Sequence, residues 1–316
     1  MSALDIQHVS RQWPGEPQPS VDDVSLTIPA GQFTVLLGPS GCGKTTLLKM
    51  INRLYEPTGG QILINGVDAA TLPATELRRK IGYVIQQTGL FPHMTIAKNI
   101  AVVPDLLGWE RGKTDARIDE LLDLVGLPRT YRERFPRQLS GGEQQRVGVA
   151  RALAADPSFI LMDEPFGAID AITRDRLQDE LLRIQQRVRK TVLFVTHDVE
   201  EALKLADRIV VMRKGKIVQY DTPLAIVSRP ADAFVRDLVG ADDLLRRLSL
   251  VHAADVARPV ETIEPHAMTT SADTDLRTLV AQLLGSPNET LVLLNADRVP
   301  VGQVGFDDIR ASLRAG

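Results

Sequence analysis

The stretch that most constrains the fold of this chain is GPSGCGKTT, residues 38–46, between the apolar run FTVLL and the run TTLLKMINRL. It fits the pattern G-x-x-x-x-G-K-[ST], which forms a phosphate-binding loop when a strand precedes it and a helix follows it. Its glycines let consecutive backbone amides point toward one anion, which side chains would obstruct. The stretch therefore predicts an α/β nucleotide-binding fold.

Three side chains of this loop carry specific expectations. We expect the ammonium of Lys44 to contact the β and γ phosphates and the hydroxyl of Thr45 to bind Mg²⁺. Thr46 is expected to add another phosphate contact. The predicted nucleotide-binding residues of the loop are Gly38, Pro39, Ser40, Gly41, Cys42, Gly43, Lys44, Thr45 and Thr46.

Apolar runs alternate with helical patterns along the chain. KIGYVIQ, FILMD and TVLFVT have the character of strands, whereas TDARIDELLDLVGL and TRDRLQDELLRIQQRV have helical spacing. Such alternation favours a largely parallel sheet covered on both faces. The earlier strands LDIQHVS, VSLTIP and GGQILI, the last followed by an Asn65–Gly66 turn, predict a smaller antiparallel side sheet.

Composition limits the classes of partner. The 316 residues carry a net charge of −3 and a pI near 6.0, so no nucleic-acid partner is expected. The single cysteine, Cys42, excludes an internal disulfide and fits a reducing compartment. The N-terminus lacks a signal-peptide pattern, and no window approaches 18 consecutive apolar residues. We expect any membrane role to need spans from another chain.

Polar residues end three of the predicted strands. Asp163 and Glu164 follow FILM, at the sheet edge where ligands of open α/β sheets bind. We expect Asp163 to hold Mg²⁺ through water and Glu164 to act as general base toward the water that attacks the γ phosphate. His197 ends TVLFVT and is expected to contact the γ phosphate. Gln86 ends KIGYVIQ and is a candidate ligand of Mg²⁺ or of the attacking water.

A second glycine turn lies far along the chain, in RQLSGGEQQR. The helical run VGVARALAA follows it, so that Ser140, Gly141 and Gly142 would present free backbone amides at a helix N-terminus, where anions bind. A chain with one phosphate loop has no evident use for this second anion site.

GPSGCGKTT, IQQTGLFPHMT, LSGGEQQR, LMDEPFGAID and VTHD, in this order and spacing, resemble the nucleotide-binding subunit of an ABC transporter. The resemblance covers residues 1–240, with a helical subdomain at about 88–155. It implies that Gln86 is the Q-loop glutamine, His197 the switch histidine and Asp170 the D-loop aspartate. Trp13 would stack on adenine; the alternative is an aromatic that only packs. The D-loop reads GAID, where a serine and a leucine are more usual.

The same resemblance explains the second glycine turn. Two subunits facing head to tail would bring the signature residues of one chain onto the γ phosphate held by Lys44 of the other. These residues are Ser140, Gly141, Gly142, Glu143 and Gln144. The cofactors implied are ATP and Mg²⁺. The partners implied are a second copy of the chain, two membrane-spanning permease subunits and, indirectly, a solute-binding protein. The chain would lie peripherally on the cytoplasmic face of the cell membrane.

The segment QQTGLFPHMTIAKNI is where transporter cassettes of this family meet their membrane partner. Leu90, Phe91 and Met94 would then be exposed apolar contacts. The alternative is that they pack within the helical subdomain.

Longer stretches, such as LLGPSGCGKTTLLKMINRL and DEPFGAIDAITRD, resemble the ATPases of osmoprotectant importers. This resemblance implies uptake of glycine betaine, choline or carnitine. The alternatives are an importer ATPase for another small polar solute, such as an amino acid, and a soluble ABC ATPase acting on DNA or ribosomes. The soluble relatives insert a long coiled coil or fuse two cassettes, which this chain does not. A P-loop kinase or GTPase would have no use for LSGGEQQR.

The sequence changes character past Gly240. Residues 241–316 hold 7 Arg, no Lys and 11 Asp or Glu, a net charge of −4. Helix, strand, strand and helix patterns follow in DTDLRTLVAQLLG, TLVLLN, VPVGQV and FDDIRASLR. This order is compatible with a small C-terminal α+β module, a single CBS-like repeat, which the resemblance implies here. Related modules sense ionic strength through cationic surface, a mechanism that an acidic tail does not suit. A plain dimerisation appendage is the alternative.

Overall fold

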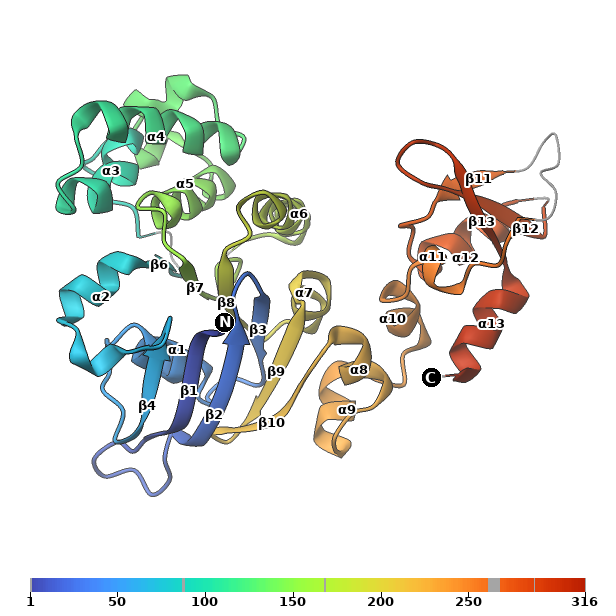
Figure 1. Ribbon diagram of the computed structural model, residues 1–316, viewed down its shortest axis with the longest axis horizontal. Coiled ribbons are helices and arrows are strands. Elements are labelled where there is room, and N and C mark those ends of the chain that lie inside the picture. The colour runs from blue at the N-terminus through green and yellow to red at the C-terminus, as the bar shows by residue number, and fades with distance from the viewer. Residues whose placement is uncertain (1, 87–88, 168, 261–267, 287, 316) are drawn as a thin grey trace. The chain divides into compact units, whose positions relative to one another are not determined.

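The computed structural model describes residues 2–86, 89–167, 169–260, 268–286 and 288–315. The chain divides into two compact units, Met1–Tyr220 and Asp221–Gly316 (Figure 1). Each unit has its own apolar core, and each is described separately below.

A six-stranded sheet forms the centre of the first unit. Five of its strands are parallel, as predicted. The middle strands are buried along their whole length, which is typical of parallel strands covered on both faces. The last strand joins by a hairpin through Lys214 and Gly215, which both have positive φ. The strand order is β10 (Lys216–Asp221), β9 (Arg208–Arg213), β3 (Phe33–Leu37), β8 (Thr191–Thr196), β7 (Phe159–Asp163) and β6 (Ile81–Val84).

The predicted side sheet is also present and is antiparallel. Asn65 and Gly66 form its tight turn with φ values of 51° and 79°, as the Asn-Gly pair predicts. The helix α1 (Lys44–Ile51) packs between the two sheets, where Leu47 and Leu48 join a core formed by residues of both. The side sheet has the order β2 (Val21–Pro29), β1 (Ser2–Arg11), β4 (Gly59–Ile64) and β5 (Val67–Asp68).

Three helices contact one another to form a helical part of the first unit. The completely buried Asn99 fastens the segment before them, because its side chain bonds the backbone of Phe91, Met94 and Thr95. Phe91 is nevertheless 40% exposed. The three helices are α3 (Ile96–Leu106), α4 (Arg111–Leu124) and α5 (Gly141–Leu153); the first unit also holds α2 (Ala74–Lys80), α6 (Ala171–Val188) and α7 (Val199–Leu205).

The second unit contains the expected helix, two strands and helix, together with elements that the sequence patterns did not predict. Its strand order is β11-β12-β13, with β11 and β12 parallel and β12 and β13 antiparallel. Residues 261–267 of the expected CBS-like repeat lie outside the described residues. The expected elements are α12 (Leu276–Leu284), β12 (Thr290–Leu294), β13 (Pro300–Gly305) and α13 (Phe306–Ala315); the others are α8 (Pro223–Ser228), α9 (Ala233–Val239), α10 (Leu244–Ser249), α11 (Ala253–Val256) and β11 (Thr269–Ser271).

The division into units falls at Tyr220, ahead of the domain boundary expected near Gly240. The reason is that α8 packs against both α9 and α10, so residues 221–240 join the tail by their contacts. Their assignment to the ATPase domain stays a prediction.

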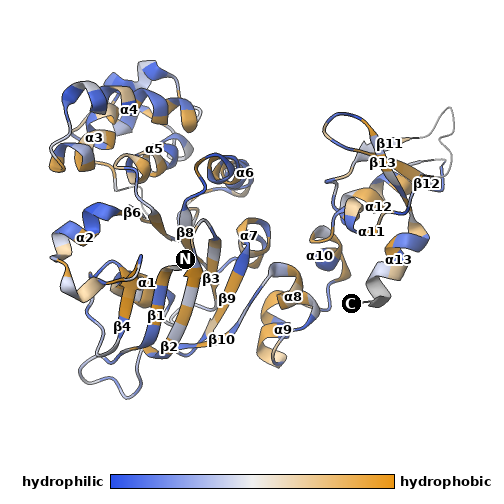
Figure 2. Cartoon of the chain, viewed as in Figure 1, coloured by the Kyte–Doolittle hydropathy of each residue, from blue (hydrophilic) through white to orange (hydrophobic). Residues whose placement is uncertain are grey.

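None of the helices in the described ranges combines the length and apolar character that crossing a membrane requires. The 18-residue helix α6 carries hydrophilic residues along its length (Figure 2).

Candidate functional site

The phosphate loop joins β3 to α1 and is closely packed against neighbouring backbone. Gly43, with φ 109°, caps the N-terminus of α1. A β-carbon on Gly43 would lie 2.3 Å from the carbonyl oxygen of Ser20, and one on Gly38 would lie 2.4 Å from that of Met212. Since backbone cannot yield as a flexible side chain can, these two positions require glycine.

Lys44 begins α1 and is only 4% exposed. Its ammonium donates hydrogen bonds to the carbonyl oxygens of Gly38, at 2.6 Å, and Pro39, at 3.0 Å. The loop thus encloses a cation, as expected for a site that binds phosphate groups. The neighbouring thiol of Cys42 is buried, and burial raises its pKa, so it stays neutral in this loop.

The predicted metal ligands Thr45 and Asp163 lie in contact although they are far apart in the sequence. The hydroxyl of Thr45, on α1, donates to Oδ1 of Asp163, at the end of β7, over 3.0 Å. Burial raises the pKa of the Asp163 carboxyl, against the hydrogen bond from Thr45. A hydroxyl and a carboxylate are hard oxygen donors that fit Mg²⁺, whose other ligands are commonly phosphate oxygens and waters.

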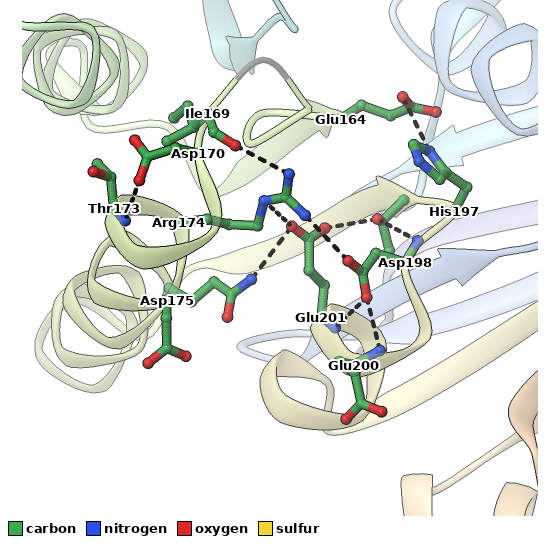
Figure 3. A network of polar contacts seen from close by, with 12 residues as sticks. Glu164, Ile169, Asp170, Thr173, Arg174, Asp175, His197, Asp198, Glu200 and Glu201 are labelled. Atoms are coloured by element: carbon green, nitrogen blue, oxygen red, sulfur yellow. Dashed lines mark hydrogen bonds and ion pairs between the residues drawn. The ribbon is translucent and has the colours of Figure 1, made fainter.

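Glu164 and His197 lie together at the carboxyl ends of β7 and β8 (Figure 3). Oε2 of Glu164 is 3.3 Å from Nδ1 of His197, with the two side chains 22% and 56% exposed. The backbone of Glu164 has a φ of 44°, in the left-handed region that few residues other than glycine adopt. Its amide donates to the carbonyl oxygen of Val195, which fixes it to β8. Strained conformations of this kind concentrate at functional sites.

Gln86 follows β6 and is exposed. A β-carbon on Gly167 would lie 3.1 Å from its Nε2, so the amide lies against the loop that follows Glu164. The structure therefore brings Gln86 to the same edge as Glu164. Its role as a Mg²⁺ or water ligand stays a prediction.

Trp13 lies beside the phosphate loop and is also packed. Tyr55 contacts it edge-on, with ring centroids 4.9 Å apart, and the guanidinium of Arg11 lies 4.0 Å from its ring centroid. Trp13 and Gly41 line one surface hollow of about 450 Å³.

The signature residues form the start of α5. Ser140 caps the helix in a reciprocal box: Glu143 accepts hydrogen bonds from its backbone amide, at 2.8 Å, and its hydroxyl, at 2.9 Å. These bonds lower the pKa of the Glu143 carboxyl. Gln144 donates to the carbonyl oxygens of Pro136 and Leu139. Gly141 has open space around it, and α5 and α1 lie in separate parts of the first unit (Figure 1).

The signature turn lies close to the first turn of α6, which follows the D-loop. A β-carbon on Gly142 would lie 3.2 Å from Cγ2 of Thr173, so α5 packs closely on the first turn of α6. Asp170 caps α6 by accepting a hydrogen bond from the amide of Thr173 at 3.0 Å, and this bond lowers the pKa of its carboxyl.

Three charged residues of this region were missed from the sequence. Arg174 on α6 and Asp198 and Glu201 at α7 form a connected polar network between the D-loop and His197 (Figure 3). The sequence did hold one signal for Arg174. Arg174 and Gln178 fall on the face of α6 that carries the buried Leu181, at helical spacings of four and three. Polar residues on a buried helix face need partners.

The fold and this site define a nucleotide-binding cassette of the ABC type, which is an ATPase. The chain belongs to the ABC transporter family: residues 21–167 match the family model described as ABC transporter. Three relatives extend the match over most of the chain.

The carnitine transport ATP-binding protein OpuCA of Listeria monocytogenes is 46% identical over 98% of this chain and 77% of its own length. The glycine betaine uptake system ATP-binding protein YehX of Escherichia coli is 47% identical over 97% and 98% of the two chains. The osmoprotectant import ATP-binding protein OsmV of Salmonella typhimurium is 52% identical over 82% and 69%.

Solved structures agree with the fold. The dimeric structure of MJ0796, a bacterial ABC transporter cassette, has a TM-score of 0.62 at 33% identity, covering 70% of this chain and 98% of that one. A dimeric post-hydrolysis state of the same cassette, bound to ADP and Pi, has a TM-score of 0.61.

Proposed function

We propose that this chain hydrolyses ATP to drive uptake of a compatible solute, of the glycine betaine, choline or carnitine type, through separate membrane subunits. The observation that carries this proposal is the identity of 46–52% to three relatives named for carnitine, glycine betaine and osmoprotectant transport. The match to the glycine betaine protein spans nearly all of both chains, tail included. An importer of another small polar solute is the second candidate, because solute choice belongs to the permease and binding protein.

The phosphate loop supplies the binding half of the reaction. Lys44 and the loop amides would bind the β and γ phosphates, and Thr45 and Asp163, which are in contact, would offer two oxygen ligands beside them. Mg²⁺ bound by Thr45 and Asp163 would neutralise charge on the phosphates. Trp13 would stack on adenine from the hollow that it shares with Gly41.

The sheet edge supplies the chemical half. Glu164 would accept a proton from the water that attacks the γ phosphorus, while the bond to the β-phosphate oxygen breaks to release ADP. His197, 3.3 Å from Glu164, would contact the γ phosphate, and Gln86 would hold Mg²⁺ or the attacking water. In this proposal Glu164 takes up the proton, and Lys44 and His197 stabilise the charge on the phosphates.

The signature turn would act on the nucleotide of a second copy of the chain. Ser140 donates its hydroxyl proton to Glu143 in this structure, so contact with the partner's γ phosphate would exchange one acceptor for the other. Gly141 leaves open space for that approach, and the amides of Gly142, Glu143 and Gln144 stand in the first turn of α5. Asp170 of the D-loop would face the same partner.

The remaining assignments concern the membrane. The exposed Phe91 supports contact of the segment before α3 with one of two permease subunits, which in turn receive solute from a binding protein. The chain would then lie on the cytoplasmic face of the cell membrane. The tail, with its strand, helix, strand, strand and helix order, would be a single CBS-like module.

Replacing Glu164 by Gln tests the function. We expect Glu164→Gln to lower the ATP turnover rate about 100-fold or more while ATP binding is preserved, because the amide cannot take the proton. The measurements are phosphate release and nucleotide binding on the purified chain. The matched control is Glu110→Gln, an exposed carboxylate outside the site, which should hydrolyse ATP at the normal rate.

The same pair of variants decides the transport assignment. In cells that also produce the permease and binding protein, labelled betaine, choline or carnitine should accumulate with the normal chain and with Glu110→Gln but not with Glu164→Gln. Normal hydrolysis by Glu164→Gln would remove its assignment as base. If the normal chain hydrolyses ATP but none of the three solutes is taken up, the proposed class of solute is wrong.

A further inference from the structure

Arg174 connects the D-loop to the start of α7 through its guanidinium. Its NH2 group donates to the carbonyl oxygen of Ile169, the residue before Asp170, at 3.0 Å. Its NH1 group donates to Oδ2 of Asp198 at 3.3 Å, and its Nε lies 3.9 Å from Oε1 of the buried Glu201. One side chain therefore ties a backbone atom of the D-loop to two carboxylates that belong to another helix (Figure 3).

Glu201 and Asp198 in turn connect to Thr196, the residue before His197. Thr196 donates its hydroxyl proton to Oε2 of Glu201 at 2.6 Å and accepts a hydrogen bond from the amide of Asp198 at 3.0 Å. Asp198 caps α7 through the amides of Glu200 and Glu201. The imidazole of His197 is more than half exposed, so its position relative to Glu164 depends on these backbone anchors.

Burying the carboxylate of Glu201 costs free energy, so the network is not explained by stability alone. Glu201 is 5% exposed, and burial raises the pKa of its carboxyl in spite of the bond from Thr196. Its other oxygen accepts from the amide of Gln178 at 3.3 Å. A buried ion pair usually stabilises a fold no better than apolar residues of the same volume would. The specific gain is a connection from the backbone of the D-loop to the segment that carries His197.

We propose that Arg174 and Glu201 are positioning residues, which transmit the position of the D-loop at Ile169 and Asp170 to His197 and thereby to Glu164. The inference rests on the proposed head-to-tail dimer, in which the D-loop faces the second copy. Arrival of that copy moves or fixes the carbonyl of Ile169, and Arg174 carries the displacement to the backbone around His197. Hydrolysis then waits for the partner because His197 takes its productive place only afterwards.

The test compares a variant of the half-buried Arg174 with a variant of the exposed Arg176, both on α6. Arg174→Met should lower kcat for ATP about 10- to 100-fold while KM changes less than about threefold, because small misplacements of catalytic groups have effects of this size. Arg174→Lys keeps the charge but cannot donate to Ile169 and Asp198 together as the guanidinium does, so its kcat should be intermediate. The matched control Arg176→Met, on the exposed face of α6, should retain normal kcat.

A double-mutant cycle distinguishes coupling between the D-loop and His197 from a local loss of structure around Arg174. Asp170→Ala and Arg174→Met should be non-additive, the double variant being no slower than the slower single one, because both interrupt one connection. A purely structural Arg174 would lower Tm and give additive effects on kcat. Should Arg174→Met fail to fold, Arg174→Lys and Glu201→Gln replace it in the cycle with Asp170→Ala.

Two results would overturn the inference: normal kcat in folded variants of Arg174, or additivity with Asp170→Ala. Neither result touches the proposed function, since Glu164→Gln tests that independently. Conversely, a fully active Glu164→Gln would remove the assigned base and leave the measured coupling between Asp170 and Arg174 standing.

Discussion

At the start of α1, Gly43 combines a φ of 109° with a β-carbon position only 2.3 Å from the carbonyl oxygen of Ser20. The positive φ disfavours any residue other than glycine. The short distance means that a β-carbon would collide with the backbone oxygen of Ser20. Glu164 also has a positive φ, of 44°, without being glycine. Two residues of the site therefore have backbone conformations that few residues other than glycine adopt.

Gly43→Ala should raise the Kd for ATP about tenfold or more, since the loop must move to admit the methyl group. The control is Gly108→Ala, whose φ of 70° is also positive but which has no atom within 4 Å of the new β-carbon. That control should lose about 1 kcal/mol of stability from backbone strain and bind ATP normally. Equal nucleotide affinity of the two variants, measured by titration calorimetry, would contradict the role of the collision.

At the scale of elements, the start of α5 depends on the reciprocal cap between Ser140 and Glu143. The pKa of Glu143 is lowered chiefly by the hydrogen bond from the amide of Ser140. A carboxyl whose folded pKa is depressed stabilises the fold at pH above its ordinary value of 4.5 and loses this contribution as pH falls through the lower folded value.

Glu143→Gln should therefore lower Tm at pH 7 by up to about 2–4 °C, as expected for a helix cap of about 1 kcal/mol. The difference from the normal chain should shrink as the pH falls from 4.5 through the lower folded pKa, below which Glu143 is protonated in both states. Thermal unfolding followed by circular dichroism across this range measures it. A difference in Tm that stays constant with pH would mean that the charge of Glu143 does not contribute.

Longer elements were predictable and short ones were not. The central strands of the main sheet are largely apolar runs, and the helices α6 and α12 have apolar periodicity over whole segments, so their type follows from sequence. The six- and seven-residue helices α8 and α9 and the three-residue strand β11 are too short to show a period. They form because their few apolar residues pack on neighbours that sequence patterns do not identify.

At the scale of the whole molecule, one copy of the chain holds the phosphate loop and the signature turn in separate parts of its first unit (Figure 1). The proposed function joins them only across two copies. Bound ATP would then act as the link, because its γ phosphate meets Lys44 of one chain and Ser140 of the other.

Purified Glu164→Gln should dimerise at saturating ATP with Mg²⁺ withheld, and light scattering should show the molar mass doubling. Lys44→Met should stay monomeric under the same conditions, since it lacks the cation that binds the phosphates. Glu164→Gln that binds ATP but remains monomeric would contradict the composite site.

The sequence by itself determined the phosphate loop, the main strands and the candidate residues at their ends, because each depends on neighbouring residues in one segment. Only the tertiary structure showed that Thr45 meets Asp163, and that Arg174, which the sequence patterns missed, meets Ile169, Asp198 and Glu201. These contacts join distant segments, and they depend on the order of strands in the sheet and on how α5, α6 and α7 pack. Local periodicity determines secondary structure, but burial and strand order determine which polar groups meet.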